Sequence, residues 1–288
     1  MKTKIYFFSA ILLFGFFFLS SCKKDEIESD TTSSEDNSLA ENMFEDVFKV
    51  VDETLKSNDL DGNKSYIYNH NYGDCGIVTI EPAGRGVFPK TITIDFGDTN
   101  CVGNDGVSRR GKIITTITDY YRNAGCVITT TLDNYYVNEY KVEGTKTVTN
   151  EGRNEADHLY YTIEVSDASI TSPEGEEITW QSNRTREWIE GEETTVLTDG
   201  LAGILDDVYL ITGSSSGVNR FGKSYTITIT EALRVESDCF WISEGTIEIA
   251  PEDKKIRTLD YGDGTCDFNA TVTIDGKTHD IILRGKRR

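Results

Sequence analysis

One five-residue stretch has the residue types of a hydrolase nucleophile. Gly213-Ser214-Ser215-Ser216-Gly217 fits the pattern G-x-S-x-G, in which an exposed serine would attack an acyl carbonyl. An aspartate and His279 follow it in the chain order of a catalytic triad. That motif requires a strand before the serine and a helix after it, but residues 218–224 have two glycines close by, carry no apolar helical stripe and lead into another β-type segment. We therefore interpret the stretch as a serine-rich hairpin loop.

Paired carboxylates are the second candidate for catalysis. Glu176-Glu177 and Glu192-Glu193 have the residue type that glycosidases use as acid and base. Both pairs lie in predicted turns, where charged side chains usually face water. No glycine-rich phosphate loop is present either. The sequence therefore predicts a protein that is not an enzyme and needs no cofactor, with a glycan-active enzyme as the third hypothesis.

The cysteines accompany a run of residues that occurs twice. Asp95-Phe96-Gly97-Asp98-Thr99-Asn100-Cys101 matches Asp260-Tyr261-Gly262-Asp263-Gly264-Thr265-Cys266 at Asp, aromatic, Gly, Asp and Cys. Cys75 and Cys239 lie upstream of the two runs. The equivalence of the two units predicts the disulfides Cys75–Cys101 and Cys239–Cys266 and leaves Cys126 unpaired. A metal site is the competing use, but there is no Cys-x-x-Cys and the three histidines are scattered.

The aspartates of the two runs are the only candidate metal ligands. Asp95 with Asp98, and Asp260 with Asp263, supply the hard oxygen atoms that Ca²⁺ prefers. No Asp-x-Asp-x-Asp spacing fixes a calcium cage. We expect these side chains to accept hydrogen bonds from nearby backbone amides and predict no resident metal.

The repeated run also resembles the turn of PKD domains, an immunoglobulin-like module of cell-surface proteins. Gly144–Asn150 resembles the last strand of that module. In a PKD domain the two pieces lie within one short module, whereas here some forty residues separate them, and the cysteines are foreign to the pattern. We interpret the match as convergent turn chemistry.

The N-terminus has the three parts of a secretion signal. Two lysines precede an apolar run from Ile5 to Leu19, and Ser20-Ser21 follows directly before Cys22. The run is shorter than the roughly twenty residues of a transmembrane helix. The pattern resembles that of bacterial lipoproteins, in which the peptide is cut just before the cysteine and the cysteine is acylated. The resemblance implies that residues 1–21 are removed and that Cys22 is the lipidation site; the alternative is an ordinary signal peptide with a chance cysteine.

The residues after this cysteine indicate where in the cell envelope the protein is located. Lys23-Lys24-Asp25-Glu26 resembles the export signal of surface lipoproteins in Bacteroidetes. This resemblance implies an outer-membrane protein that faces the cell exterior, with the periplasmic face as the alternative. Residues 22–38 are otherwise rich in Ser, Thr, Asp and Glu, so we predict a flexible acidic tether.

Charge restricts the possible partners. The formal net charge is −20, and it becomes −22 once Lys2 and Lys4 are removed with the signal peptide. A chain of this sign does not suit nucleic acid, whose binding needs a basic face. It does not suit adsorption onto anionic headgroups either, so the predicted membrane contact is the lipid anchor.

One helix is predicted, at residues 39–57. Ser38 and Glu41 have the spacing of a capping box. Apolar residues then recur at helical spacing on one face: Phe44, Val47, Phe48, Val51 and Leu55. The other face is acidic, so we expect the apolar stripe to pack on the sheet that follows.

From residue 66 to residue 288 the sequence predicts an all-β domain. The period changes to two in segments rich in β-branched and aromatic residues, namely residues 91–94, 112–117, 127–132, 160–165 and 225–230. Turn signals separate them: Asn104-Asp105-Gly106, Asn123-Ala124-Gly125, Glu143-Gly144, Glu151-Gly152, Pro173-Glu174-Gly175, Glu190-Gly191, Ser216-Gly217, Glu244-Gly245 and Asp275-Gly276. Strands so closely spaced predict an antiparallel meander, as a large curved sheet, a sandwich or a half-open barrel.

A second pair of similar stretches lies in the middle of the chain. Tyr161-Thr162-Ile163 with Asp167-Ala168 resembles Tyr225-Thr226-Ile227 with Glu231-Ala232. We interpret the echoes as related hairpin units stacked along one sheet, with two related lobes as the alternative.

Two function classes follow from this sequence. The first is a non-enzymatic, lipid-anchored envelope protein whose partner is a glycan, another envelope protein or a host surface. Aromatic residues in strand-like stretches could stack on sugar rings, although such residues also form ordinary cross-strand pairs: Trp180, Trp188, Trp241, Tyr135, Tyr136, Tyr160 and Tyr161. The second class is a carrier that holds an apolar molecule between the sheet and the helix.

Overall fold

The structure is a computed structural model, and it describes residues 31–58, 60, 72–194, 205–239, 241–252 and 254–282. The predicted signal peptide, Cys22 and residues 23–26 lie outside the described residues. One long helix, α1 (Thr32–Ser57), is followed by a short 3₁₀ helix, η1 (Gly73–Cys75), and by fourteen strands.

The strands follow one another with short connections. Their bounds are β1 (Ile77–Glu81), β2 (Lys90–Asp95), β3 (Cys101–Val102), β4 (Ser108–Ile117), β5 (Val127–Val137), β6 (Tyr140–Arg153), β7 (Leu159–Thr171), β8 (Glu177–Glu190), β9 (Val208–Val218), β10 (Ser224–Glu236), β11 (Ile242–Pro251), β12 (Arg257–Asp263), β13 (Asn269–Ile274) and β14 (Lys277–Ile282).

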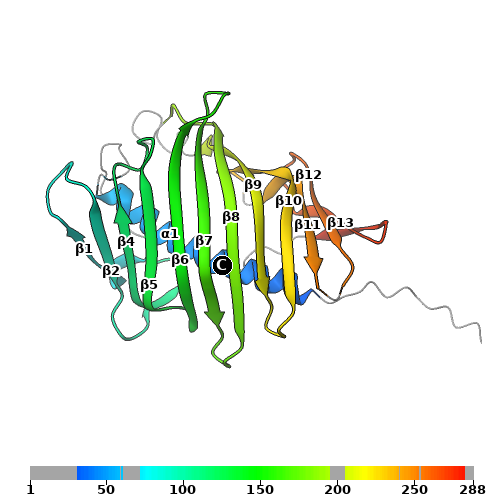
Figure 1. The fold of residues 1–288 in the computed structure, drawn as a ribbon, viewed down its shortest axis with the longest axis horizontal. Coiled ribbons are helices and arrows are strands. Elements are labelled where there is room, and N and C mark those ends of the chain that lie inside the picture. Colours follow the sequence, from blue (N-terminus) through cyan, green and yellow to red (C-terminus); the bar gives the residue numbers. More distant parts are fainter. Residues whose placement is uncertain are drawn as a thin grey trace, which may run out of the picture. The chain divides into compact units, whose positions relative to one another are not determined.

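These strands form one open antiparallel sheet (Figure 1). Their order in the sheet is their order in the chain, from β1 to β14, except that the two-residue β3 pairs only with β4. The predicted antiparallel meander is therefore confirmed, and it is a single sheet that does not close. The two echoed runs begin in β2 and in β12 of this one sheet.

The sheet has two unlike faces because side chains alternate along each strand. In β2, Ile92 and Ile94 are buried, while Thr91 and Thr93 point to the other side. The buried side faces α1, whose apolar residues join the same core: Ala40, Met43, Phe44, Val47, Val50, Val51 and Leu55. The helix therefore covers one face, as the amphipathic pattern predicted.

The helix begins at Thr32, so the prediction that residues 32–38 belong to a flexible tether was wrong. Polar contacts with the sheet order this stretch despite its composition. Asp36 is fully buried and accepts hydrogen bonds from the backbone amide and the guanidinium of Arg220. Asn37 accepts from the indole nitrogen of Trp180 at 2.9 Å. The composition of residues 32–38 did not predict this order because the residues that bind them lie far along the chain.

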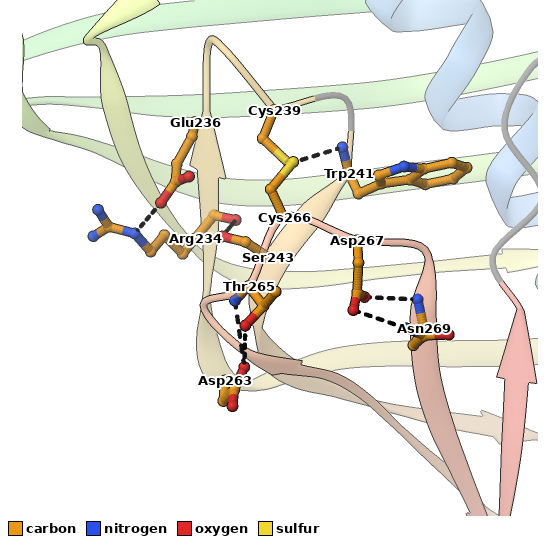
Figure 2. Close-up of a disulfide and its surroundings, with 10 residues drawn as sticks. All are labelled: Arg234, Glu236, Cys239, Trp241, Ser243, Asp263, Thr265, Cys266, Asp267 and Asn269. Carbon is orange, nitrogen blue, oxygen red and sulfur yellow. Dashed lines mark hydrogen bonds and ion pairs between the residues drawn. A yellow bond between two sulfur atoms is a disulfide. The ribbon is translucent and has the colours of Figure 1, made fainter.

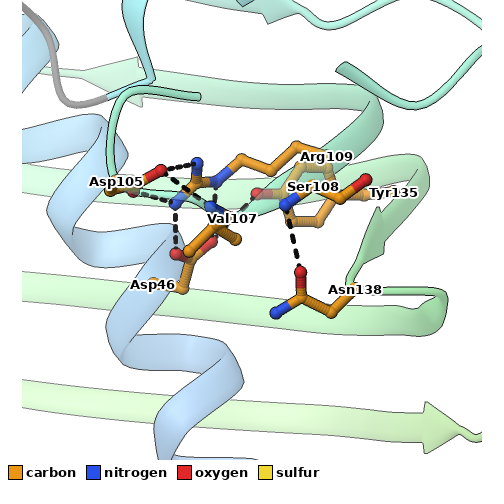
Figure 3. Close-up of polar contacts among 7 residues, drawn as sticks. All are labelled: Asp46, Asp105, Val107, Ser108, Arg109, Tyr135 and Asn138. Atoms are coloured by element: carbon orange, nitrogen blue, oxygen red, sulfur yellow. Dashed lines mark hydrogen bonds and ion pairs between the residues drawn. The ribbon is translucent and has the colours of Figure 1, made fainter. Parts of the chain in front are cut away.

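A buried ion-pair cluster fixes the middle of α1 to β4 (Figure 3). Arg109, with a side chain only 1% exposed, donates to both oxygens of Asp46 on the helix and to both oxygens of Asp105. The phenol of Tyr135 donates to Asp46 at 3.2 Å. Burial opposes the charge of Arg109, but these carboxylates outweigh it and raise the pKa of Arg109.

Four of the predicted turns are not turns. Gly144 and Gly152 lie inside β6, Gly217 inside β9 and Gly245 inside β11. At Gly144, Gly152 and Gly245 the strand pairing shifts register, which is the signature of a β-bulge. Glycine in a strand marks a bulge or a close backbone approach as readily as it marks a turn, and sequence does not separate the two.

Gly111 in β4 occupies a further bulge, in which the two backbones approach each other most closely. Its φ is +84°, and a Cβ at this position would lie 2.0 Å from the carbonyl oxygen of Asn134 in β5. We expect Gly111→Ala to lower the free energy of unfolding by about 2–5 kcal/mol, since left-handed strain and a backbone clash add together. Urea unfolding followed by circular dichroism measures the change.

Gly106 provides the matched control for this substitution. Its φ is +74°, but a Cβ there would meet nothing within 4 Å. Gly106→Ala should therefore cost only the strain, about 1–2 kcal/mol. Equal losses for the two variants would contradict the close approach between β4 and β5.

Candidate functional site

The sheet face opposite α1 carries a continuous row of polar side chains. Cross-strand pairing places one residue from each of eight successive strands in this row: Thr91, Thr116, Thr129, Thr147, Glu164, Asn183, Ser214 and Thr228. We call it the hydroxyl row. None of its members is apolar or buried. The row therefore offers a line of hydrogen-bonding groups to the solvent.

A groove of about 460 Å³ lies on this face, centred on β9. We call it the β9 trough and define it by the outward-facing residues that line it: Glu164, Gln181, Asn183, Ser214, Ser216, Thr226 and Thr228. The side chains of β9 from Gly213 to Gly217 are all small, while the strands on both sides carry larger ones. The small side chains of β9 therefore form the floor of the trough.

The two glycines that bound this floor are required by the backbone. A Cβ on Gly213 would lie 2.2 Å from the carbonyl oxygen of Asn183, and one on Gly217 would lie 2.3 Å from that of Thr179. The G-x-S-x-G letters thus arise from the close approach of β9 to β8. The stretch is neither a nucleophile elbow nor the predicted hairpin loop, because it lies inside β9.

The serine at the centre of that motif points away from the trough. Ser215 is buried on the α1 face, where its hydroxyl donates to Asn37 at 2.9 Å. The outward neighbours are different: Gln181 donates to the hydroxyl of Ser216 at 2.8 Å. Within the described part of the chain, the exposed side chains of Glu164 and Asn183 form no hydrogen bond. The trough therefore combines hydroxyls with a free carboxylate and a free amide.

Sequence reasoning did not identify the trough residues as candidates for sugar binding. Its candidates were aromatic, and the structure divides them. Four are buried on the α1 side of the sheet: Tyr135, Tyr161, Trp180 and Trp188. Tyr136 and Tyr160 lie on the other face, where Tyr136 stacks under the guanidinium of Arg110 at 3.6 Å. Neither lines the trough.

The two predicted disulfides are both present. The Cα atoms of Cys75 and Cys101 are 5.6 Å apart, and those of Cys239 and Cys266 are 5.8 Å apart. Figure 2 shows the second bridge between the β10–β11 connection and the loop after β12. Cys126 is unpaired and buried, and burial raises the pKa of its thiol. The cysteine equivalence inferred from the repeated run is thus confirmed.

The aspartates of the repeated run act on their own turns. Asp95 accepts a hydrogen bond from the amide of Gly97, and Asp260 accepts the equivalent bond from Gly262, each at 2.9 Å. Asp263 accepts from the amide and the hydroxyl of Thr265, and these bonds lower its pKa (Figure 2). These contacts are those expected of turn-capping side chains.

Metal ligands are not gathered in the described residues. Over these ranges no group of three or more His, Cys, Asp or Glu side chains could hold a metal ion. Asp98 is exposed, and Asp95 forms an ion pair with Lys112 at 2.8 Å. A hollow of about 910 Å³ at β12–β14 includes Asp260 and Asp263 in its lining, but those two carboxylates are engaged as described above.

Among the described residues, little space remains between α1 and strands β5 and β6. A cavity of about 10 Å³ remains among apolar and aromatic side chains that include Val47, Phe48 and Tyr121. This is room for about one water molecule. Beside it, Arg186 lies among the rings of Phe48, Tyr161 and Tyr209, each 5.2–5.3 Å from its guanidinium carbon. This part of the core is solid packing.

No protein-family model, curated protein or solved structure matches the chain. No helix in the described ranges is long and apolar enough to cross a membrane.

Proposed function

We propose that this chain is a lipid-anchored protein of the cell envelope that binds a neutral glycan in the β9 trough. The observation that carries the proposal is the composition of that trough. Its lining joins hydroxyl, amide and carboxylate groups on the solvent face of an otherwise regular sheet. The sequence of residues 1–22, which resembles that of a lipoprotein precursor, supports the anchor at Cys22 and an outer-membrane location.

The chemistry of the trough suits a sugar better than the other partners considered. Sugar hydroxyls both donate and accept, so they can bond to Ser214, Asn183 and Glu164 at once. An apolar ligand would find no apolar wall among the residues that define the trough. The net charge of −20 disfavours glycans that are themselves polyanions.

The trough supports binding rather than hydrolysis. Glycoside hydrolysis normally uses two carboxylates on either side of the scissile bond. Glu164 is the only carboxylate in the trough lining. The non-enzymatic role expected from the sequence is therefore retained in the proposal.

The carrier hypothesis finds less support. A carrier would need a substantial apolar cavity between α1 and the sheet. The cavity beside Val47 and Phe48 holds about 10 Å³, far less than a lipid chain requires.

Titration calorimetry with the full chain in detergent tests the trough. Neutral oligosaccharides from a glycan array would serve as ligands. We expect Asn183→Ala to weaken the binding of a selected oligosaccharide about tenfold, the effect of one lost hydrogen bond. Ser214→Tyr should abolish it by filling the trough.

Thr116→Tyr is the matched control for the filled trough. It places the same side chain in the hydroxyl row, on β4, away from β9. Binding should be unchanged in this variant. The proposal fails if no neutral oligosaccharide binds, or if Thr116→Tyr and Ser214→Tyr weaken binding equally.

The anchor is tested at its cysteine. We expect Cys22→Ala to abolish metabolic labelling with a radioactive fatty acid and to release the chain from the membrane fraction, because the acyl chains are its only strong membrane contact. Mass spectrometry of the purified chain checks the modification. A Cys22→Ala chain that stays in the membrane fraction with unchanged mass would refute the anchor.

The proposed location on the cell exterior is tested separately, with the lipid anchor intact. Protease added to whole cells should cleave the wild-type chain, while replacement of residues 23–26 by alanine should protect it. Equal protection of both chains would remove the assignment to the cell exterior.

A further inference from the structure

The first turn of α1 is fixed to one end of the sheet. Ser33 accepts a hydrogen bond at 3.0 Å from Asn219, and Asp36 pairs with Arg220. Both partners lie in the connection between β9 and β10. The helix α1 therefore begins at the end of the sheet that carries this hairpin tip (Figure 1).

Two exposed apolar side chains lie at the same end. Phe221, at the β9–β10 tip, is 69% exposed, and Ile256, before β12, is 51% exposed. The two connections are neighbours, since the amide of Glu252 donates to the carbonyl of Ser224 and the amide of Ser224 donates to the carboxylate of Glu252. The Phe221 tip is held in shape by Asn219, whose side chain accepts from the amides of Phe221 and Lys223.

Cationic residues accompany both apolar side chains. Arg220 and Lys223 flank Phe221, and Lys254-Lys255 precedes Ile256. Apolar side chains that enter the headgroup region beside Lys or Arg are typical of surfaces that rest on a bilayer. Arg220 and Lys255 are each paired with a carboxylate, that of Asp36 and that of Asp275, so the two tips present cationic side chains without being basic as a whole.

The length of chain before α1 limits how far this end can lie from the anchor. Eight residues separate Cys22 from Thr31. A chain of this length spans at most about 30 Å even when fully extended. The strands are longer: β8 has 14 residues and is therefore about 45 Å long. Only the end that carries Phe221 is bound to stay near the bilayer.

From these observations we infer that the β9–β10 tip and the β11–β12 connection form a membrane-docking surface, which inserts Phe221 and Ile256 into the headgroup region of the bilayer that holds the lipid anchor. This inference rests on the lipid anchor of the proposed function. It adds an orientation: the strands stand on the bilayer, and the β9 trough faces sideways, open to a glycan beside the membrane.

Tryptophan substitution in the acylated full chain tests the surface. Phe221→Trp and Phe268→Trp are reconstituted separately into phosphatidylcholine vesicles that contain brominated phosphatidylcholine, which quenches tryptophan on contact. Phe268 is the matched control because it is 48% exposed but follows β12 at the opposite end of the sheet. The emission that each variant adds to the wild-type signal is compared with that in unbrominated vesicles.

We expect the added emission of Phe221→Trp to be shifted to the blue and mostly lost in brominated vesicles, while that of Phe268→Trp is unchanged. Equal quenching of both variants, or of neither, in chains that float with the vesicles would overturn the docking surface and leave the anchor intact. Chains that carry no acyl group and do not float would overturn both proposals.

Discussion

Replacing Arg109 with methionine is expected to lower the free energy of unfolding by about 3–5 kcal/mol, because it leaves Asp46 and Asp105 without their shared cation. The two carboxylates are only 12% and 14% exposed, so water cannot replace the lost hydrogen bonds. The effect includes the docking of α1, since Asp46 is the helix residue that the cluster holds. Urea unfolding followed by circular dichroism measures it.

Arg110→Met is the matched control in the same strand. Arg110 points to the other face and pairs with Glu139 at 2.9 Å, with 22% and 50% of the two side chains exposed. An exposed pair of this kind contributes less than about 1 kcal/mol. Similar losses for the two variants would mean that the buried cluster does not hold the helix.

The Arg109 cluster also predicts a loss of stability in acid. Burial would raise the pKa of Asp105, but the hydrogen bonds from Arg109 and from the amide of Val107 outweigh burial and lower it. A lowered carboxyl pKa contributes stability that is present above the unfolded value of about 3.9 and is lost as the pH falls through the folded value. In the Arg109→Met chain, the free energy of unfolding should no longer include the decrease at low pH that comes from protonation of Asp105.

Replacing Lys146 with methionine is expected to stabilise the protein at pH 7 by up to about 3 kcal/mol. The ammonium of Lys146 is buried against the helix, where it donates to the carbonyl of Phe44 at 3.3 Å and lies 4.6 Å from the ring centre of Phe48. Burial lowers its pKa from 10.5 to about 8. Methionine keeps the length of the side chain without the cost of desolvating a charge.

The sign of the pH dependence identifies the cause of this effect. Between pH 8 and 10.5 the unfolded chain binds more protons at Lys146 than the folded chain does, so the stability contributed by this site rises with pH. The advantage of Lys146→Met should therefore be largest below pH 8 and vanish above about pH 10.5. The control is Lys112→Met, whose ammonium is 43% exposed and pairs with Asp95. An advantage of Lys146→Met that does not change with pH would contradict the lowered pKa.

Much of the sheet was predictable from sequence, but β9 around Gly213–Gly217 and the bulges were not. Alternation places Ile92 and Ile94 on the buried face of β2 as expected, because a half-buried strand needs nothing more than a period of two. Gly144, Gly152 and Gly245 were mistaken for turns because a bulge and a turn require the same backbone freedom. Only the partner strand decides between them.

The start of α1 could not be predicted from the local sequence. Residues 32–38 have the composition of a disordered segment, and their order comes from contacts such as that of Asn37 with Trp180. Composition rules count the apolar surface that a segment can bury, and they do not count buried polar partners supplied from elsewhere in the chain.

The candidate site was only partly visible in the sequence. The disulfide pairs followed from the repeated run, and the equivalent bonds of Asp95 and Asp260 to Gly97 and Gly262 show why that run recurs. The similarity between the stretches that precede the two runs did not reflect equivalent pairing. Thr79 pairs with Thr93, two residues before Asp95, whereas Thr246 pairs with Asp260, the equivalent of Asp95 itself.

The β9 trough could not be found from the sequence because it depends on register. Asn183 and Ser214 become neighbours only when β8 and β9 are aligned. A slip of one residue would turn each side chain to the other face, so no single strand contains the signal.

The contacts of the first helical turn also imply an order of events in folding. Every strand pair except β2–β4 joins strands that are consecutive in the chain, so each hairpin can form early at a low entropy of closure. Ser33 and Asn219, by contrast, are 186 residues apart. The start of α1 leaves the ribosome early but gains its partners only when β9 and β10 exist, so it docks late and its docking slows the final step to the native state.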